Sequence, residues 1–124
     1  DIQIVYKNFP LTYHKQAQLA ATAALAAGEQ GKFWEMHDLL YKTRNALGRE
    51  DLLEYARELK LDSAQFEKSL DSKEVTQLID QDKIQGQTLG VRNIPTTFIN
   101  GRSLTGSPPP SYIKGVIEEI LQNQ

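Results

Sequence analysis

The chain has 124 residues, a length typical of one domain, and its hydrophobic share of 40% and charged share of 24% are those of an ordinary globular protein. The net charge is -2 and the basic residues are scattered, so the sequence offers no basic patch for nucleic acid, and no apolar run is long enough for membrane insertion. The chain has no cysteine, which excludes disulfides, thiolate chemistry and cysteine-ligated zinc within these residues.

The first half of the chain predicts one strand and several helices. Residues 2–6 are mostly apolar and rich in β-branched side chains, which predicts a buried strand that starts almost at residue one. Seven alanines within residues 15–27 favour a helix there, and Gly28 is the residue expected to end it. Apolar residues at helical spacing predict two further helices over residues 32–44 and 50–59.

Two patterns with the form of a capping box follow. Asp62 with Gln65, and Asp71 with Glu74, have the spacing at which polar side chains satisfy the free amides of a helix N-terminus. We expect the second pattern to start a long helix that ends before Gly90.

The stretch around Pro95 predicts a loop, a strand and a hairpin. The residue before a proline is pushed out of the helical region, and a proline belongs at the first position of a strand because it lacks an N–H. The β-branched and aromatic residues 96–99 then form a strand, and Asn100-Gly101 is a strong hairpin signal before a return strand over residues 102–105. From the residues alone, a cis bond before Pro95 has only the ordinary frequency of X–Pro bonds.

A proline-rich connector leads to a final helix. The order is strand, four or five helices, strand, hairpin, strand and helix, which is an α/β or α+β arrangement with the helices as one block. No repeat, low-complexity segment or long linker divides the chain, so we expect a single domain over residues 1–124. The apolar face of the final helix comprises Ile113, Val116, Ile117, Ile120 and Leu121.

Several side chains have both a functional and a structural interpretation. We expect His14 to be a surface or capping residue and His37 to be a core or boundary residue. Neither histidine has an acidic or histidine partner at ligand spacing, so no metal site is predicted. Phe33, Trp34 and Tyr41 could line a hydrophobic peptide groove, but we expect them in the core of the helical block.

The remaining polar patterns predict no catalytic residue. The charged runs Glu67, Lys68, Asp71, Lys73 and Glu118-Glu119 are expected to be solvated faces. No Gly-x-Ser-x-Gly elbow supports a hydrolase, and no glycine-rich loop has the spacing of a phosphate site.

With these elements placed, the chain resembles the DsbA-like disulfide oxidoreductases, which have a thioredoxin-like fold. The likeness covers nearly the whole chain, in order and at the spacing of the family. It implies an α/β thioredoxin-like fold with a helical insertion over about residues 12–89, between the first and second strands. The matching stretches are residues 6–11 with His14, residues 28–34 with His37, residues 70–72, the helix end at Gly86, Gly90 and Val91, and residues 94–102.

The resemblance also implies a substrate-binding site. In that family the residue at Pro95 is a cis proline that faces the redox pair, and the residue at Ile94 helps to set redox poise and substrate contact. Ile94, Pro95 and Thr96, here called the proline loop, would present backbone groups to an extended peptide. The implied partners are unfolded or reduced proteins in the periplasm or another extracytoplasmic compartment.

The chain departs from the family in one large respect. Such enzymes carry, upstream, a strand and a helix that opens with Cys-x-x-Cys, whose first thiolate is the nucleophile. This chain starts at what would be the next strand, so the central N-terminal strand and both cysteines are missing. We therefore expect no thiol–disulfide exchange by the chain itself.

Loss of a central strand predicts a gap of about 10 Å between the strands at residues 2–6 and 96–99, with unpaired backbone groups on both sides. The two strands could close up, a second copy could supply a strand by domain swapping, or the chain could be a fragment. We favour the fragment, with closure or a homodimer through strand exchange or an exposed sheet edge as its consequence.

We interpret the chain as the C-terminal portion of a DsbA-like protein thiol-disulfide oxidoreductase. It keeps the proline loop but is not redox-active by itself. Two alternatives stay open: a glutathione-dependent isomerase or transferase of the kappa-like type, which resembles the same fold without Cys-x-x-Cys, and a non-catalytic peptide-binding module. No catalytic residue, cofactor, metal or nucleic acid is predicted for this chain.

Overall fold

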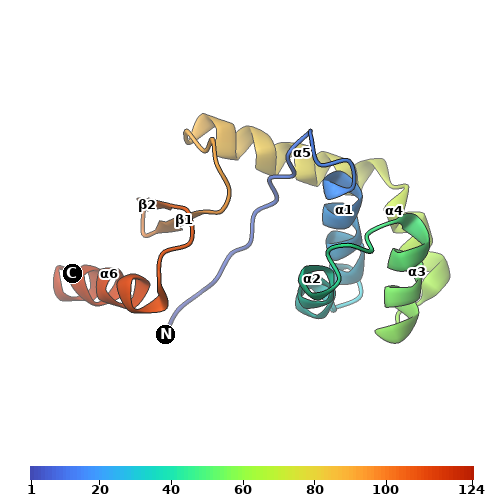
Figure 1. Ribbon diagram of the computed structural model, residues 1–124. Helices are drawn as coiled ribbons and strands as arrows, with labels where there is room; N and C mark the ends of the chain where they lie inside the picture. The colour runs from blue at the N-terminus through green and yellow to red at the C-terminus, as the bar shows by residue number, and fades with distance from the viewer. The chain divides into compact units, whose positions relative to one another are not determined.

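The computed structural model describes residues 1–124 and contains six helices and two strands (Figure 1). The chain forms two compact units, residues 1–85 and residues 86–124, which are described in turn. None of the helices combines the length and apolar character needed to cross a membrane. The first unit holds α1 (Ala17–Gly28), α2 (Phe33–Lys42), α3 (Arg49–Glu58), α4 (Ser63–Leu70) and most of α5 (Lys73–Thr88), at the positions where the sequence predicts helices.

The core of the first unit is built around α1, which contacts α2, α3 and α4. Ala23, Ala26 and Ala27 are fully buried, and their small side chains let the neighbouring helices approach closely. The alanine run therefore serves packing as well as helix propensity. The larger side chains that fill this core come from the other helices: Met36, Leu52, Phe66 and Leu70.

The turn from α1 to α2 is tight. A Cβ atom placed on Gly28 would lie 3.2 Å from the Cβ of Phe33, so the first residue of α2 packs directly on the end of α1. Gly31 has a φ of +77°, in the left-handed region that glycine adopts without steric cost. These two glycines let α2 fold back against α1.

Polar side chains fasten this turn to α4. The side chain of Gln30 donates to the carbonyl of Asp62 at 3.1 Å and accepts from its N–H at 2.8 Å. The Ser69 hydroxyl donates to Glu29 at 2.5 Å. Asp62 Oδ1 accepts from the N–H of Gln65 at 2.9 Å, which confirms Asp62 as the predicted cap of this helix.

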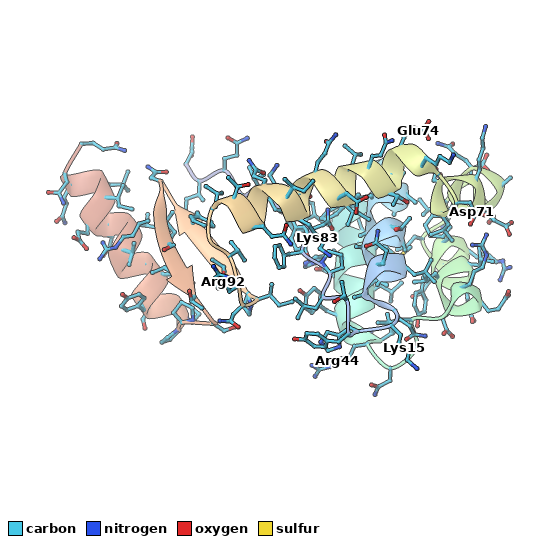
Figure 2. All side chains as sticks on the ribbon, turned by 90° about the horizontal axis from the view of Figure 1, so that it is seen from above. Lys15, Arg44, Asp71, Glu74, Lys83 and Arg92 are labelled. Atoms are coloured by element: carbon cyan, nitrogen blue, oxygen red, sulfur yellow. The ribbon has the colours of Figure 1, made fainter.

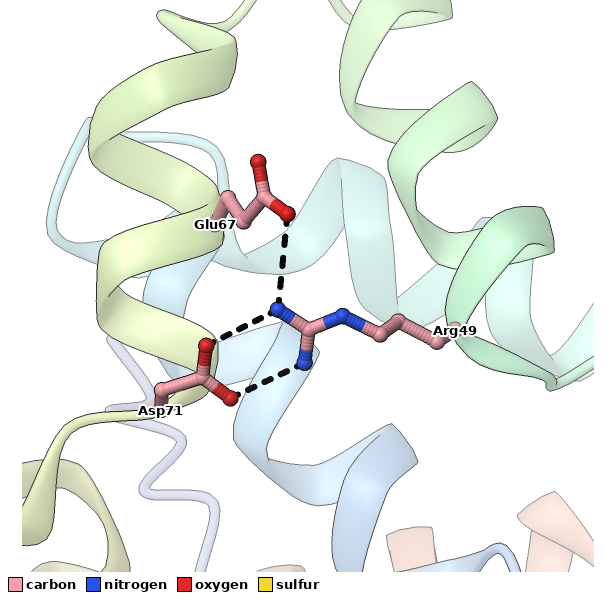
Figure 3. Close-up of polar contacts among 3 residues, drawn as sticks. All are labelled: Arg49, Glu67 and Asp71. Carbon is pink, nitrogen blue, oxygen red and sulfur yellow. Dashed lines mark hydrogen bonds and ion pairs between the residues drawn. The ribbon is translucent and has the colours of Figure 1, made fainter.

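The second predicted cap is wrong. The start of α5 is capped by Ser72, whose hydroxyl accepts from the N–H of Val75 at 3.3 Å. Asp71 lies at the corner between α4 and α5 (Figure 2) and instead accepts hydrogen bonds from Arg49 at 2.9 and 2.8 Å (Figure 3). The same guanidinium lies 3.5 Å from Glu67. The charged guanidinium of Arg49 donates two hydrogen bonds to Asp71, which is why Asp71 does not cap α5. The carboxylates of Glu67 and Asp71 both stay exposed, as expected of a solvated face.

The predicted strand over residues 2–6 is also wrong. This segment is an extended coil (blue in Figure 1), and Ile4 is 75% exposed. A strand requires backbone pairing with a neighbour, and the only paired strands are β1 and β2, so these β-prone residues stay extended but unpaired. The segment becomes fixed at Asn8, whose N–H and side-chain amide both donate to Asp82 of α5, at 2.9 and 3.0 Å.

The second unit contains the end of α5, an antiparallel hairpin of β1 (Thr96–Ile99) and β2 (Arg102–Thr105), and α6 (Pro110–Gln122). Both strands and their two-residue turn are where the sequence predicts them. Asn100 and Gly101 have positive φ values of 47° and 89°, as a type I′ turn requires. The sheet thus has two strands, one fewer than predicted.

Helix α6 closes the second unit. Pro110 occupies its first turn, where a missing N–H costs nothing. Along the predicted apolar face, Val116 is buried while Leu121 is exposed. Arg102 of β2 donates to Glu119 of α6 at 3.0 Å, so the hairpin face that carries Arg102 is turned toward α6.

Candidate functional site

The proline loop lies in the second unit, where the segment that follows α5 enters β1. Ile94 is 47% exposed, Pro95 is exposed, Thr96 is half-buried, and the Ile94–Pro95 peptide bond is cis. Two hydrogen bonds hold the loop: the N–H of Gly106 donates to the carbonyl of Pro95 at 2.8 Å, and the Thr96 hydroxyl donates to the carbonyl of Asn93 at 2.6 Å. These two hydrogen bonds therefore fix the loop, while Ile94 and Pro95 stay exposed to solvent.

One edge of β1 is unpaired. β1 pairs only with β2, in a register that sets Ile99 opposite Arg102. A two-residue turn makes these two residues a hydrogen-bonded pair, and such pairs alternate along an antiparallel ladder. The backbone amides and carbonyls of Thr96 and Phe98 therefore point away from β2, toward an edge that no strand covers.

An open cavity of about 260 Å³, here called the hairpin cavity, lies on one face of β1 and β2. Loop residues 89–93 line one side of it. Arg92 belongs to this loop and lies beside the strands (Figure 2). Its guanidinium has no hydrogen-bond or ion-pair partner in the chain, and no acidic side chain lines the cavity. Four hairpin side chains line the other side: Thr96, Phe98, Ser103 and Thr105.

A second group of side chains, here called the aromatic surface, lies in the first unit and comprises Tyr6, Phe33, Trp34, His37 and Tyr41. The ring of Tyr6 lies 5.4 Å from that of Phe33 and 5.1 Å from that of His37. Trp34 is 47% exposed and Tyr41 is 64% exposed, so the prediction that they belong to the core is wrong for both. Only Phe33 packs against the core, because neighbouring residues of a helix point to different sides.

Burial affects one titratable group of this surface. Desolvation, followed by the nearby Tyr41 phenol, raises the pKa of Tyr6 to about 12. The Tyr6 hydroxyl is therefore protonated at neutral pH and does not act as a base.

The two histidines lie where the sequence predicts them. His37 is half-buried on α2, and its Nδ1 lies 3.0 Å from a carboxylate oxygen of Asp38. His14 is exposed, with its ring 4.6 Å from that of Tyr13. No group of three histidine, aspartate or glutamate side chains could hold a metal ion.

Sequence reasoning missed Arg92 of the hairpin cavity, Tyr6 of the aromatic surface and Asp82, which holds Asn8 of the N-terminal segment. Arg92 had a usable signal, because the predicted hairpin register already places alternate side chains on one face beside its loop. Tyr6 and Asp82 had none, because their contacts join the N-terminal segment to α2 and α5, far away along the chain. Neither site contains a thiol, so the arrangement can bind a ligand but cannot exchange disulfides.

Residues 1–118 match the model of a family described as the DSBA-like thioredoxin domain. The chain is 30% identical over 130 residues to a probable disulfide bond formation protein D of Bacillus anthracis, covering 98% of this chain and 58% of that protein. It is 44% identical over 108 residues to a Na(+)/H(+) antiporter NhaA 1 of Salinispora arenicola (strain CNS-205), covering 86% of this chain and 17% of the antiporter. The chain thus spans less than two thirds of the length of these curated relatives.

One solved structure is similar over almost the whole chain. It is a thioredoxin-like oxidoreductase from Silicibacter pomeroyi DSS-3, which superposes with a TM-score of 0.84 at 28% sequence identity. The superposition covers 95% of this chain and 68% of that one. The likeness therefore extends to the fold as well as to the sequence.

Proposed function

Because the chain belongs to the family of DSBA-like thioredoxin domains and has a thioredoxin-like fold, we propose that it is the part of a DsbA-like thiol-disulfide oxidoreductase that holds the polypeptide substrate. Ile94, Pro95 and Thr96 bind an extended, unfolded or reduced chain in an extracytoplasmic compartment. This chain has no cysteine, so it performs no exchange by itself.

The unpaired backbone of the exposed proline loop carries this proposal. An extended peptide that pairs with the chain needs a free amide and carbonyl, and no hydrogen bond within the chain engages those of Ile94. The carbonyl of Pro95 is engaged with Gly106, so the loop is held in place while its solvent side stays free.

A thiol pair outside these residues completes the reaction. In thiol–disulfide exchange a thiolate attacks one sulfur of a disulfide, a mixed disulfide forms, and the other sulfur leaves as a thiolate. The contribution of this chain is positional, because a substrate strand fixed at the proline loop presents its sulfur in a constant orientation.

The transport named for the antiporter relatives is not part of this proposal. The match covers 17% of the Salinispora arenicola protein, so most of that protein has no counterpart here. The disulfide bond formation protein matches 98% of this chain over more than half of its own length, and it is the better guide to function.

Fluorescence anisotropy with a labelled, extended polypeptide that contains no cysteine tests the proposal. We expect saturable binding that Pro95→Ala weakens about tenfold, the equivalent of about 1.4 kcal/mol. Pro108→Ala, which changes a proline of the connector before α6, should keep the native affinity, and far-UV circular dichroism should show that both variants are folded. Equal affinity in the two variants, or no saturable binding by the native chain, would refute the proposal.

A further inference from the structure

We propose that the edge of β2 that faces away from β1, here called the β2 edge, docks an acidic, extended segment of a partner protein. The central strand that the family's sheet holds beside β1 lies on the opposite side of the hairpin, so it leaves the β2 edge open. The β2 edge is separate from the proline loop, and this inference therefore does not rest on the proposed function.

Backbone groups along the β2 edge are free to pair. Because Ile99 and Arg102 form a hydrogen-bonded pair, the amides and carbonyls of Ser103 and Thr105 point away from β1. Both residues are exposed, and no hydrogen bond within the chain engages their backbone groups. An added strand therefore finds the free donors and acceptors that strand pairing requires.

The β2 edge lacks the features that keep strands from pairing. Edge strands are commonly protected by proline, by lysine or by charged side chains that oppose an incoming strand. Strand β2 has neither proline nor lysine, and its charged residue, Arg102, is engaged with Glu119 of α6. The outward-facing residues are a serine and a threonine, which leave the backbone accessible.

The hairpin cavity gives the β2 edge a preference for acidic side chains. Ser103 and Thr105 line this cavity, so side chains of an added strand that lie opposite them are on the same face. Arg92 also lines the cavity, and its guanidinium has no partner within the chain. Guanidinium groups bind carboxylates through paired, charge-assisted hydrogen bonds. Glutamate or aspartate at alternate positions of the partner segment therefore complements this face.

Charge also favours another protein over a second copy of this chain as the partner. Antiparallel pairing of two copies through their β2 edges would bring two Arg92 side chains to one face of the joined sheet. The acidic side chains of the second unit are already used, because Glu119 pairs with Arg102 at 3.0 Å and Glu118 with Lys114 at 3.8 Å. The second unit of another copy thus offers no free carboxylate to Arg92.

Two labelled, cysteine-free peptides of equal length test the charge preference by fluorescence anisotropy. One has glutamate at alternate positions and the other has glutamine at the same positions. We expect the whole chain to bind the glutamate peptide about tenfold more tightly, and Arg92→Gln to abolish this preference. Arg44→Gln is the matched control, because it removes an equal charge from an exposed, unpartnered arginine of the first unit (Figure 2).

Amide chemical-shift mapping with the glutamate peptide tests the location. We expect the largest saturable shifts at Ser103 and Thr105. Ser103→Pro removes an outward-facing amide and should abolish binding of both peptides, while far-UV circular dichroism shows that the variant is folded. If Ser103→Pro does not fold, the shift mapping of the native chain decides the location by itself.

The outcomes separate this inference from the proposed function. Equal affinity for the two peptides, an unchanged preference in Arg92→Gln, or largest shifts outside β2 would overturn it. Displacement of the glutamate peptide by the uncharged polypeptide that tests the proline loop would overturn it too, because the two would then share one site. A dimer that dissociates as the glutamate peptide binds would assign the β2 edge to a second copy and overturn the partner protein. Failure of the uncharged polypeptide to bind would refute the proposed function and leave this inference standing.

Discussion

Arg49 joins α3 to α4 through one guanidinium that reaches two carboxylates (Figure 3). Its hydrogen bonds hold the pKa of Asp71 below the usual value. A carboxyl group with a lower pKa in the folded state stabilises the fold above its unfolded pKa, and that contribution is lost as the pH falls through the folded pKa. Because the pair is exposed, solvent screens it and the contribution is modest.

We expect Arg49→Ala to lower the free energy of unfolding more at neutral pH than in strong acid, where Asp71 is protonated and the charge pair is lost. Urea unfolding followed by circular dichroism at the two pH values measures this difference. Arg57→Ala, which removes an exposed arginine from the same helix, should have the same small effect at both pH values. An effect of Arg49→Ala that does not change with pH would contradict the account.

For Tyr6 we expect the opposite pH dependence: its contribution to stability is lost as the pH rises. Its pKa is raised to about 12, so its contribution to stability is complete below the unfolded pKa of about 10 and is lost as the pH rises through 12. Tyr6→Phe should therefore flatten the loss of unfolding free energy across this range, measured by urea unfolding at successive pH values. Tyr112→Phe, at an exposed position of α6, is the control. Parallel curves for the native chain and Tyr6→Phe would argue against a raised pKa of Tyr6 in the folded state.

At the scale of elements, Asp82 of α5 anchors the segment that precedes α1. It accepts two hydrogen bonds from Asn8, which is buried, so its removal leaves two donors without partners. We expect Asp82→Ala to lower the free energy of unfolding by about 1–3 kcal/mol. Amide hydrogen exchange around Asn8 should become faster in the same variant.

Asp80→Ala is the matched control for this anchor, because Asp80 lies on the same helix and is exposed. Its effect on unfolding free energy should stay within about 0.5 kcal/mol. Equal effects of the two substitutions would show that Asp82 does not anchor the N-terminal segment.

The elements that the sequence predicts correctly are those specified by local chemistry. The alanine run of α1, the Asp62 cap and the Asn100-Gly101 turn each depend on residues that are neighbours in the chain, so their signals are complete in the sequence. The predicted strand over residues 2–6 does not form, because a strand also requires a partner, which no local sequence pattern supplies.

Only part of the candidate site could likewise be predicted from the sequence. The proline loop is visible as a motif, whereas the aromatic surface depends on which side of α2 the core covers. Helical spacing groups Phe33 with His37 but does not say how much of Trp34 or Tyr41 the other helices bury. Asp71 has the spacing of a cap, yet Arg49, which is distant in sequence, takes its carboxylate.

At the scale of the whole molecule, two unpaired β-prone surfaces remain: residues 2–6 and the open edge of β1. Exposed edges recruit strands, so we propose that the chain dimerises through strand exchange or edge pairing. Size-exclusion chromatography with light scattering should show a dimer that increases with concentration. Ile4→Lys should favour the monomer, and Leu78→Lys, which changes an exposed leucine of α5, should not. A folded, concentration-independent monomer would count against this proposal.

The central claim is that an extended polypeptide binds at the proline loop. Amide chemical-shift mapping of the isotope-labelled chain, titrated with an unlabelled polypeptide that contains no cysteine, tests it most directly. The account predicts that the largest saturable shifts occur at Ile94 and Thr96. Shifts confined to Phe33, Trp34 and Tyr41 of the aromatic surface, or no saturable shifts at all, would contradict it.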